Sequence, residues 1–287
     1  MSEAIISAIR WAGGKFESVS ESPRLDAEVL LAHCLDKPRS YLYSWPERQL
    51  DDESWQNFQK LVAERLKPTP IAYLTGQREF YSRSFRCRPG ALVPRPETEL
   101  LVETALAEIP SASTMSVCDL GTGTGIIAIT LKLERPRARL YATDIDPVCI
   151  ELARENAETH GAELTCYQSD WYESLPRDLR FGLIVANPPY IAADHPFLAR
   201  GDLPAEPQIA LTPGQSGLEA LKIIVDGAAG YLEAGGQLIL EHGYDQQAGV
   251  AALLENAGFG EIRCEFDHND LPRTSIAKRL ENAGAPA

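Results

Sequence analysis

The stretch Asn187-Pro188-Pro189-Tyr190 has the residue types needed to hold a planar –NH2 group. It follows the apolar run Phe181–Ala186, which is typical of a buried strand. The Asn side-chain oxygen and the Pro188 carbonyl are acceptors, and the two prolines lack N–H donors. We therefore expect this tip to accept both hydrogens of an amide or amino nitrogen, with Tyr190 adding a flat aromatic face. The alternative is an ordinary Asn-Pro turn after a strand.

A second motif is a glycine-rich turn between a short apolar strand and an apolar helix start. It is Asp119-Leu120-Gly121-Thr122-Gly123-Thr124-Gly125. Glycines at such a turn let the backbone approach a ligand closely. The spacing is Gly-x-Gly-x-Gly, whereas dinucleotide-binding turns have Gly-x-Gly-x-x-Gly. The acid before the glycines suits a ligand with a positively charged amino-acid end better than a pyrophosphate.

A third feature is an acid at the end of the next strand, Arg139 to Asp144. Acids in this position commonly bind the hydroxyl pair of a ribose. The alternative is that Asp144 only caps the helix that starts near Pro147. Together with the glycine turn, Asp144 fits S-adenosyl-L-methionine (SAM), which has a methionine end, a ribose and an adenine.

These motifs together resemble the class I methyltransferases that act on planar nitrogen. More specifically, the chain resembles the PrmC/HemK family, which methylates a glutamine side-chain amide in peptide chain release factors. The stretches that carry this resemblance, besides the tip and the glycine turn, are 72–81, 93–99, Glu241-His242-Gly243 and Asn269-Asp270. One segment departs from the family pattern. The usual Asp-Val-Arg-Phe-Glu-Pro is here Asp202-Leu203-Pro204-Ala205-Glu206-Pro207.

The resemblance implies methyl transfer from SAM to the N5 amide of the glutamine in a Gly-Gly-Gln loop of class I release factors, with S-adenosyl-L-homocysteine as product. The implied catalytic and substrate-binding residues are Asn187, Pro188, Pro189 and Tyr190. The implied cofactor-binding residues are Asp119, Gly121, Thr122, Gly123, Thr124, Gly125, Asp144, Asp170, Trp171 and Asn187. In this family Asp170 or Trp171 would flank the adenine, although a core tryptophan is an equal alternative for Trp171.

Three other functions are compatible with parts of the pattern. An adenine-N6 nucleic-acid methyltransferase uses the same kind of tip, with Tyr190 stacking on a flipped base. Against it stands the formal net charge of −14, because a nucleic-acid footprint requires a basic surface. A ribosomal-protein glutamine N5-methyltransferase is harder to separate from the first choice. A SAM-binding protein without activity would need a broken tip, and this tip is intact.

Composition places limits on metals and compartment. The six cysteines are scattered without a Cys-x-x-Cys pair, so we expect no zinc site. His195, His242 and His268 are each isolated, and we expect them to be structural. No signal peptide and no run of about 18 apolar residues is visible, so we expect a cytoplasmic protein that does not cross a membrane. We also expect a monomer.

The elements that must position these residues fall into three segments. Residues 1–78 have helical patterns and are expected to form a small bundle, either purely structural or for substrate recognition. In its second helix, Leu25, Val29, Ala32 and Leu35 are expected to share the buried face. Residues 79–95 are expected to form a β-hairpin linker.

Residues 96–282 alternate between strands and helices. This pattern predicts an α/β, Rossmann-like class I SAM-dependent methyltransferase domain with a mostly parallel sheet. Ligands of such sheets bind beyond the carboxyl ends of the strands. Asp119, Asp144, Asp170 and Asn187 all fall at predicted strand ends, so we expect them at one edge.

Overall fold

The computed structural model describes residues 3–280 and divides into two units. One unit comprises the described residues up to Gln77 together with Pro196–Glu206. The other comprises Arg78–His195 and the described residues from Pro207 onward. The last two residues of the predicted catalytic domain, 281–282, lie outside the described range. Every helix among residues 3–280 is too short or too polar to cross a lipid bilayer.

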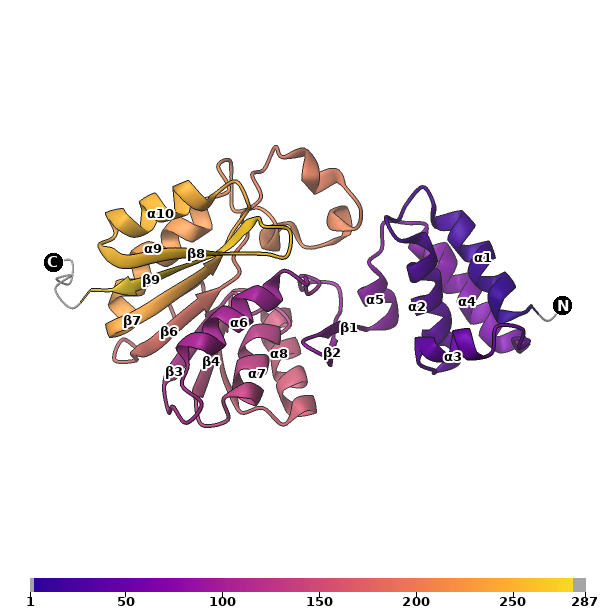
Figure 1. Cartoon of the computed structure of the whole chain (residues 1–287), viewed down its shortest axis with the longest axis horizontal. Coiled ribbons are helices and arrows are strands. Elements are labelled where there is room, and N and C mark those ends of the chain that lie inside the picture. The colour runs from indigo at the N-terminus through magenta and orange to yellow at the C-terminus, as the bar shows by residue number, and fades with distance from the viewer. Residues whose placement is uncertain (1–2, 281–287) are drawn as a thin grey trace. The chain divides into compact units, whose positions relative to one another are not determined.

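The first unit is a bundle of helices, as expected (Figure 1). Its helices are α1 (Ile5–Phe16), α2 (Pro23–Leu35), α3 (Arg39–Ser44), α4 (Asp52–Arg65) and α5 (Ile71–Thr75). Their starts follow local sequence signals. Pro23 occupies the first turn of α2, and the Asp51 side chain accepts a hydrogen bond from Ser54 N at 2.7 Å to cap α4.

The predicted face of α2 is only partly buried, because Ala32 and Leu35 contact the bundle core but Leu25 does not. Leu25 is 41% exposed, whereas Ala27, Leu30 and Leu31 are fully buried in the bundle core. Both faces of this helix carry apolar residues, so spacing alone did not decide between them. The packing of α1 and α4 against α2 selects the face that also carries Glu28, which is 2% exposed.

The segment that departs from the family pattern belongs largely to this first unit. It contains the 3-10 helix η2 (Leu203–Ala205), and η1 (Pro196–Ala199) precedes it. Leu203 and Glu206 are buried, and Asp202 pairs with Arg65 of α4 at 2.6 Å. The residues of the departing segment are therefore placed by the helical bundle.

A two-stranded hairpin follows the first unit and spans 77–86, whereas the expected hairpin linker was 79–95. Its strands are β1 (Gln77–Phe80) and β2 (Arg83–Arg86). The two turn residues, Tyr81 and Ser82, both have left-handed φ angles, 49° and 58°. Two successive positive φ angles are the signature of the tight turn that matches strand twist in hairpins.

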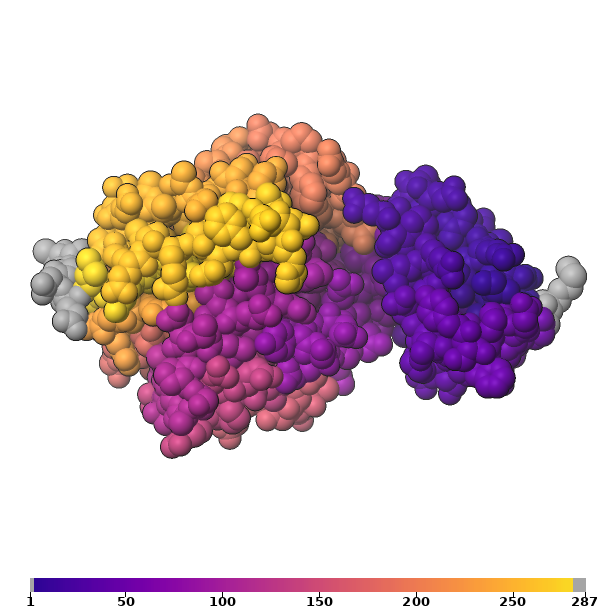
Figure 2. Space-filling model, viewed as in Figure 1, coloured from indigo at the N-terminus to yellow at the C-terminus, as the bar shows by residue number. Residues whose placement is uncertain are grey.

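The second unit is built on a seven-stranded sheet in the order β5-β4-β3-β6-β7-β9-β8. The strands are β3 (Ser116–Leu120), β4 (Arg139–Asp144), β5 (Leu164–Gln168), β6 (Phe181–Ala186), β7 (Leu232–Glu241), β8 (Phe259–Phe266) and β9 (Pro272–Arg279). Five strands are parallel, and β9 pairs antiparallel with both β7 and β8. The predicted mostly parallel sheet is confirmed. The antiparallel pair was not anticipated, and in Figure 2 its residues (yellow) form a broad part of the visible surface of this unit.

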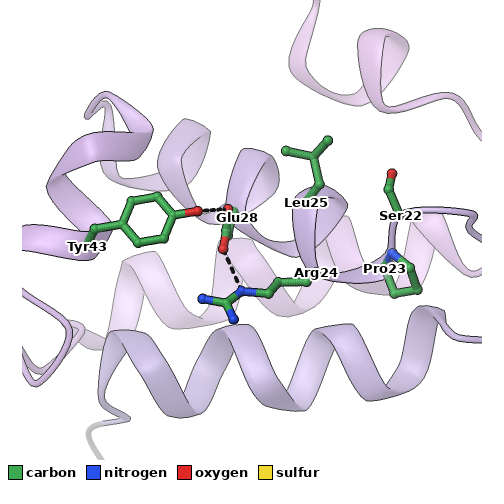
Figure 3. A pocket seen from close by; sticks show the side chains of 6 residues that line it. All are labelled: Ser22, Pro23, Arg24, Leu25, Glu28 and Tyr43. Atoms are coloured by element: carbon green, nitrogen blue, oxygen red, sulfur yellow. Dashed lines mark hydrogen bonds and ion pairs between the residues drawn. The ribbon is translucent and has the colours of Figure 1, made fainter.

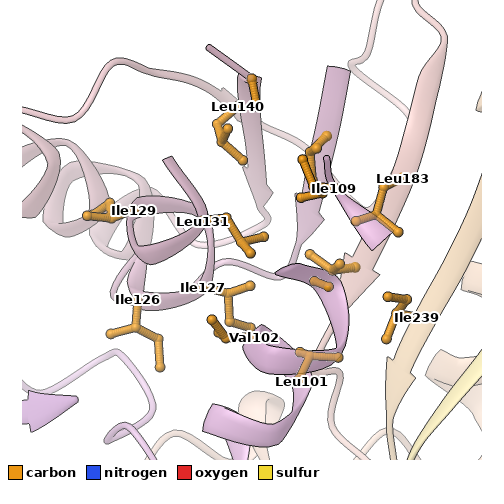
Figure 4. Close-up of a cluster of buried hydrophobic side chains, with 14 of the residues drawn as sticks. Leu101, Val102, Ile109, Ile126, Ile127, Ile129, Leu131, Leu140, Leu183 and Ile239 are labelled. Carbon is orange, nitrogen blue, oxygen red and sulfur yellow. The ribbon is translucent and has the colours of Figure 1, made fainter. Parts of the chain in front are cut away.

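Helices cover both faces of the sheet. These are α6 (Thr98–Glu108), α7 (Ile126–Glu134), α8 (Pro147–His160), α9 (Glu219–Tyr231) and α10 (Gln247–Asn256), and a short 3-10 helix η3 (Gln208–Ala210) precedes α9. Leucine and isoleucine side chains of α6 and α7 interlock with Leu183 and Ile239 of the sheet (Figure 4). A separate cluster joins the opposite face to α9 and α10. Helices packed on both faces of the sheet therefore hold in place the strand ends that carry the candidate site.

Candidate active site

The predicted site residues lie at one edge of the sheet because the strands that carry them are parallel and in register. Leu120 of β3 pairs with Thr143 of β4 and with Ala186 of β6, and Ala186 pairs with Leu240 of β7. The residues that follow these positions, including Asn187 and Glu241, therefore leave the sheet side by side. This is the edge at which open α/β sheets bind ligands.

The glycine turn has the backbone shape that its sequence indicates. Gly121, Gly123 and Gly125 have φ angles of 71°, 55° and 84°, which side chains rarely adopt. A Cβ on Gly125 would lie 3.1 Å from the backbone of Ala153 in α8, so this glycine also lets two helices approach. No atom lies within 4 Å of a Cβ built on Gly123, which leaves its backbone open to a ligand.

Asp144 is held rigidly against this turn. It is 9% exposed, its Oδ2 accepts from Gly123 N at 2.8 Å, and its Oδ1 accepts from Asp146 N at 2.9 Å. Burial raises the pKa of Asp144. Each carboxylate oxygen keeps a further lone pair, so the arrangement fits a ribose hydroxyl pair. Asp146, not Asp144, caps α8, with its side chain accepting from Val148 N at 2.8 Å.

Asp119 lies beneath the turn and is fully buried. Its Oδ2 accepts from Thr122 Oγ1 at 2.6 Å and from Ala128 N at 3.3 Å. Its Oδ1 has no hydrogen-bond partner among the described residues. Burial raises the pKa of Asp119 to about 7. One oxygen thus holds the turn and the start of α7, and the other is a buried acceptor that is left unsatisfied.

Trp171 and Asp170 differ in their surroundings. The Trp171 ring packs over the glycine turn, 3.3 Å from a Cβ built on Gly121, and also borders the core cluster under α9 and α10. Its φ of 45° is left-handed, which is unusual for a bulky residue and indicates a conformation imposed by its surroundings. Asp170 is exposed. One ring therefore packs against both the core and the glycine turn.

The tip after β6 presents an oriented amide. Asn187 Nδ2 donates to Thr98 Oγ1 at 3.0 Å, so the Asn187 amide oxygen remains the acceptor for a ligand. The Tyr190 hydroxyl donates to Glu241 Oε1 at 3.3 Å, and Gln246 Nε2 donates to the Tyr190 carbonyl at 2.9 Å. Burial, followed by the charge of Glu241, raises the pKa of Tyr190, so this side chain stays a neutral phenol.

Neither histidine nor cysteine forms a reactive group at this edge. His242 is fully buried between the Gly243 carbonyl, at 2.9 Å, and the Ser275 hydroxyl, at 2.8 Å. Burial lowers the pKa of His242, so it is neutral near pH 7. Within residues 3–280, no group of three or more His, Cys, Asp or Glu side chains has the arrangement of a metal site.

Sequence reasoning missed two residues of this site, Thr98 and Glu241. Each lies at most 1% exposed and each is hydrogen-bonded to a tip residue. A signal was present for Glu241, because it ends a predicted strand at the same edge as Asn187. For Thr98 the only signal was that it belongs to the stretch 93–99, which resembles the family. Its contact with Asn187 depends on where α6 lies in the fold.

The comparison with known proteins identifies the family. A family model described as the PrmC N-terminal domain matches residues 7–76, and one described as the methyltransferase small domain matches residues 96–200. A release factor glutamine methyltransferase of Burkholderia pseudomallei (strain K96243) is 45% identical over 257 residues, 88% of this chain and 90% of that protein. The chain belongs to the release factor glutamine methyltransferase family.

Further matches agree with this family and with the fold. A release factor glutamine methyltransferase of Vibrio cholerae (serotype O1, strain ATCC 39315) is 40% identical over 282 residues, 97% of this chain and 98% of that protein. The crystal structure of a methyltransferase from Pyrococcus furiosus superposes with a TM-score of 0.54 at 15% identity, covering 70% of this chain and 91% of that chain. The class I SAM-dependent methyltransferase fold and the PrmC/HemK resemblance are therefore confirmed.

Proposed function

We propose that this chain transfers the methyl group of SAM to the N5 amide nitrogen of the glutamine in the Gly-Gly-Gln loop of class I peptide chain release factors, and so acts in translation termination. Family membership over nearly the whole chain supports the substrate class. The observation that carries the chemistry is the Asn187 amide, which Thr98 turns so that its oxygen accepts a substrate hydrogen.

The residues at the sheet edge fit SAM. The open backbone at Gly123 and the unsatisfied Oδ1 of Asp119 would receive the methionine end, and Asp144 would receive the ribose. Trp171 and Asp170, which follow β5, would flank the adenine. When bound, SAM supplies an electrophilic methyl group on a sulfonium.

The chain's own part in the reaction is to position the substrate nitrogen. An amide nitrogen is a poor nucleophile because its lone pair is delocalised. Acceptors on both of its hydrogens, Asn187 Oδ1 and the Pro188 carbonyl, aim that nitrogen in line with the methyl group and strengthen as it becomes positive. Tyr190, buried on one side, provides the flat wall against which a planar amide lies.

We further propose that the helical unit holds the release factor, because the residues of the reaction lie in the other unit. Its surface includes two exposed aromatic side chains, Tyr43 at 56% and Trp45 at 57%. Figure 3 shows Tyr43 beside a hollow lined by Leu25 and Arg24, where its hydroxyl donates to the buried Glu28. Exposed aromatic anchors next to charged groups are typical of protein-binding surfaces.

The proposed substrate acts on ribosomes, so we place the enzyme in the cytoplasm. The six cysteines are free thiols, which a reducing compartment preserves. We also propose that it acts as a monomer without contacting nucleic acid or membrane, with the overall charge of −14 opposing a nucleic-acid substrate.

A labelling assay tests this function. The full-length chain is incubated with methyl-labelled SAM and, separately, an intact class I release factor, a short Gly-Gly-Gln peptide, ribosomal proteins or DNA. We expect label on the intact release factor and much less on the peptide, which lacks a surface for the helical unit. If DNA or a ribosomal protein acquired more label than the release factor, the proposed substrate would be wrong.

The variant Asn187→Ala tests the role of the tip in the same assay. Its single-turnover rate should fall by about a hundredfold or more, because one preorganised acceptor is lost. SAM affinity, measured by calorimetry, should remain close to that of the unmodified chain. A near-normal rate in this variant would refute the role proposed for Asn187.

A further inference from the structure

The loop between β8 and β9 contains the family-like pair Asn269-Asp270, which has no part in the proposed function. This loop is built around the carboxylate of Asp267. Its Oδ1 accepts from the backbone N–H groups of Asn269 at 2.8 Å and Leu271 at 3.1 Å. Its Oδ2 accepts from Arg273 Nε at 3.0 Å. The loop therefore holds the Arg273 side chain in a defined place.

Arg273 lies at the same edge of the sheet as the tip. β9 starts at Pro272 and runs antiparallel to β7, and the Arg273 carbonyl accepts from His242 N at 2.9 Å. His242 directly follows Glu241, whose carboxylate accepts from the Tyr190 hydroxyl. Burial and Glu241 raise the pKa of Tyr190 against the positive charge of Arg273, so the guanidinium lies within electrostatic reach of the tip. Figure 1 shows the β8–β9 loop (yellow) at the end of the sheet where β7 finishes.

The guanidinium of Arg273 is held on two sides and has donors to spare. Its Nε is bound to Asp267, and its central carbon lies 5.7 Å from the centre of the Tyr244 ring. Arginine has five N–H donors. Within residues 3–280 the two Nη groups have no hydrogen-bond partner, although the side chain is only 18% exposed. Neither Nη nitrogen is cut off from solvent, so an incoming acceptor can reach both.

The order of the strands indicates which ligand these donors meet. The glycine turn and Asp144 follow β3 and β4, whereas Arg273 lies beyond β7, and β6 with the tip stands between them. SAM bound over β3 and β4 therefore leaves Arg273 to the substrate. An extended glycine-rich loop presents main-chain carbonyl oxygens that no side chain shields. Carbonyl oxygens are acceptors that a guanidinium, which has donors only, can bind.

We propose that Arg273 is a substrate-binding residue, whose Nη groups donate to a glycine main-chain carbonyl of the Gly-Gly-Gln loop while Asn187 holds the glutamine amide. This inference rests on the proposed function and deepens it. A glutamine side chain is flexible, so a second anchor on the main chain restricts the directions from which its amide approaches the methyl group. Tyr244, which is 53% exposed, extends the same surface toward α10.

The first test compares Arg273→Met with Lys278→Met in steady-state methylation of an intact class I release factor and of a Gly-Gly-Gln peptide. Arg273→Met keeps an apolar stem but has no donor. Its kcat/KM should fall by about tenfold to a hundredfold on both substrates, mainly through KM, because a charged hydrogen bond to bound substrate is lost. Lys278, near the other end of β9, pairs with Glu261 at 3.0 Å, and its variant should be normal. SAM affinity by calorimetry should be unchanged in both.

The second test removes the acceptor from the substrate. In two further peptides a trans-alkene replaces either the Gly–Gly or the Gly–Gln amide link, so that one glycine carbonyl is missing and the extended shape is kept. With the unmodified chain, one of these peptides should have a kcat/KM lower by about tenfold or more. That peptide should show no further loss with Arg273→Met, because both changes remove the same hydrogen bond.

Three results would overturn the inference: a normal kcat/KM for Arg273→Met, equal losses in Arg273→Met and Lys278→Met, or a loss in Arg273→Met that is undiminished with both alkene peptides. If Arg273→Met does not fold, the peptides decide with the unmodified chain, and equal kcat/KM for all three peptides would reject the proposed contact. Absence of label on the release factor with the unmodified chain would instead remove the proposed function.

Discussion

Both units of this molecule bury carboxylates, but only the helical unit pairs them with arginines. In the helical unit Glu28 accepts from Arg24 at 2.9 Å and from Arg39 at 3.0 Å, and Asp26 pairs with the buried Arg65 at 2.9 Å. Burial alone would raise the pKa of Glu28. Hydrogen bonds from Tyr43 and the two arginines outweigh it and hold that pKa below its usual value.

In the methyltransferase unit the buried carboxylates have no such partners. Across the described residues, neither Asp119 nor Glu241 forms a salt bridge, and each keeps one oxygen without a hydrogen bond. Burial raises the pKa of both to about 7.

The difference separates structure from function. A buried acid whose charge is matched by arginine contributes to folding, and removing one partner is costly. A buried acid left unmatched destabilises the fold, and it persists where binding or catalysis needs it. By this criterion we propose Asp119 and Glu241 as site residues, and Glu28 and Asp26 as structural ones.

The largest expected effect is in the helical unit. Arg65→Ala should lower the free energy of unfolding by about 3–5 kcal/mol, because it leaves Asp26 and Asp202 without their shared cation. Denaturant unfolding measures this loss. Lys67→Ala is the matched control, since the Lys67–Glu64 pair is exposed and should contribute at most about 1 kcal/mol. Equal losses in the two variants would contradict the structural role of Arg65.

An intermediate effect is the pH dependence of stability in the methyltransferase unit. Because folding raises the pKa of Glu241 from 4.5 to about 7, the native state binds more protons between these values, and stability should fall as pH rises through them. Glu241→Gln should remove the share of this slope that Glu241 contributes, leaving that of Asp119, and gain about 2–3 kcal/mol at pH 8. Thermal unfolding from pH 5 to pH 8 measures both quantities.

The variant Glu28→Gln should change the stability at pH 8 in the opposite direction. The pKa of Glu28 is lowered on folding, so its contribution is present above the unfolded pKa and is lost as pH falls. This variant should therefore be less stable than the unmodified chain at pH 8. A gain in stability from Glu28→Gln, or a loss from Glu241→Gln, would break the distinction between the two units.

The smallest expected effect concerns the cofactor. Asp144→Ala should weaken SAM binding by about 1–3 kcal/mol, because it removes the proposed ribose acceptor and frees Gly123 N. Calorimetry at pH 8 measures the change. Glu28→Gln, in the other unit, should bind SAM normally. Unchanged affinity in Asp144→Ala would refute the ribose assignment.

The sequence alone determined the catalytic unit in detail. The bounds predicted for β4 and β6 are those observed, because these segments have strong apolar runs with clear stop signals. The order of strands and helices then implied a parallel sheet, and the parallel sheet brings Asp119, Asp144 and Asn187 to one edge. The glycine turn and the strand ends beside it could therefore be located from local pattern and topology.

The tertiary structure alone decided which groups share a buried environment. Periodicity placed Leu25 on the inner face of α2, but packing against α1 and α4 turned Ala27, Leu30 and Glu28 inward.

The contacts of the Asn187 amide show the same limit. Thr98 begins α6 and Glu241 ends β7, far from the tip in sequence. Thr98 meets Asn187, and Glu241 meets Tyr190, only once the sheet and its covering helix are assembled. Hydrogen bonds and burial of this kind depend on long-range geometry, which residue types and spacing do not encode locally.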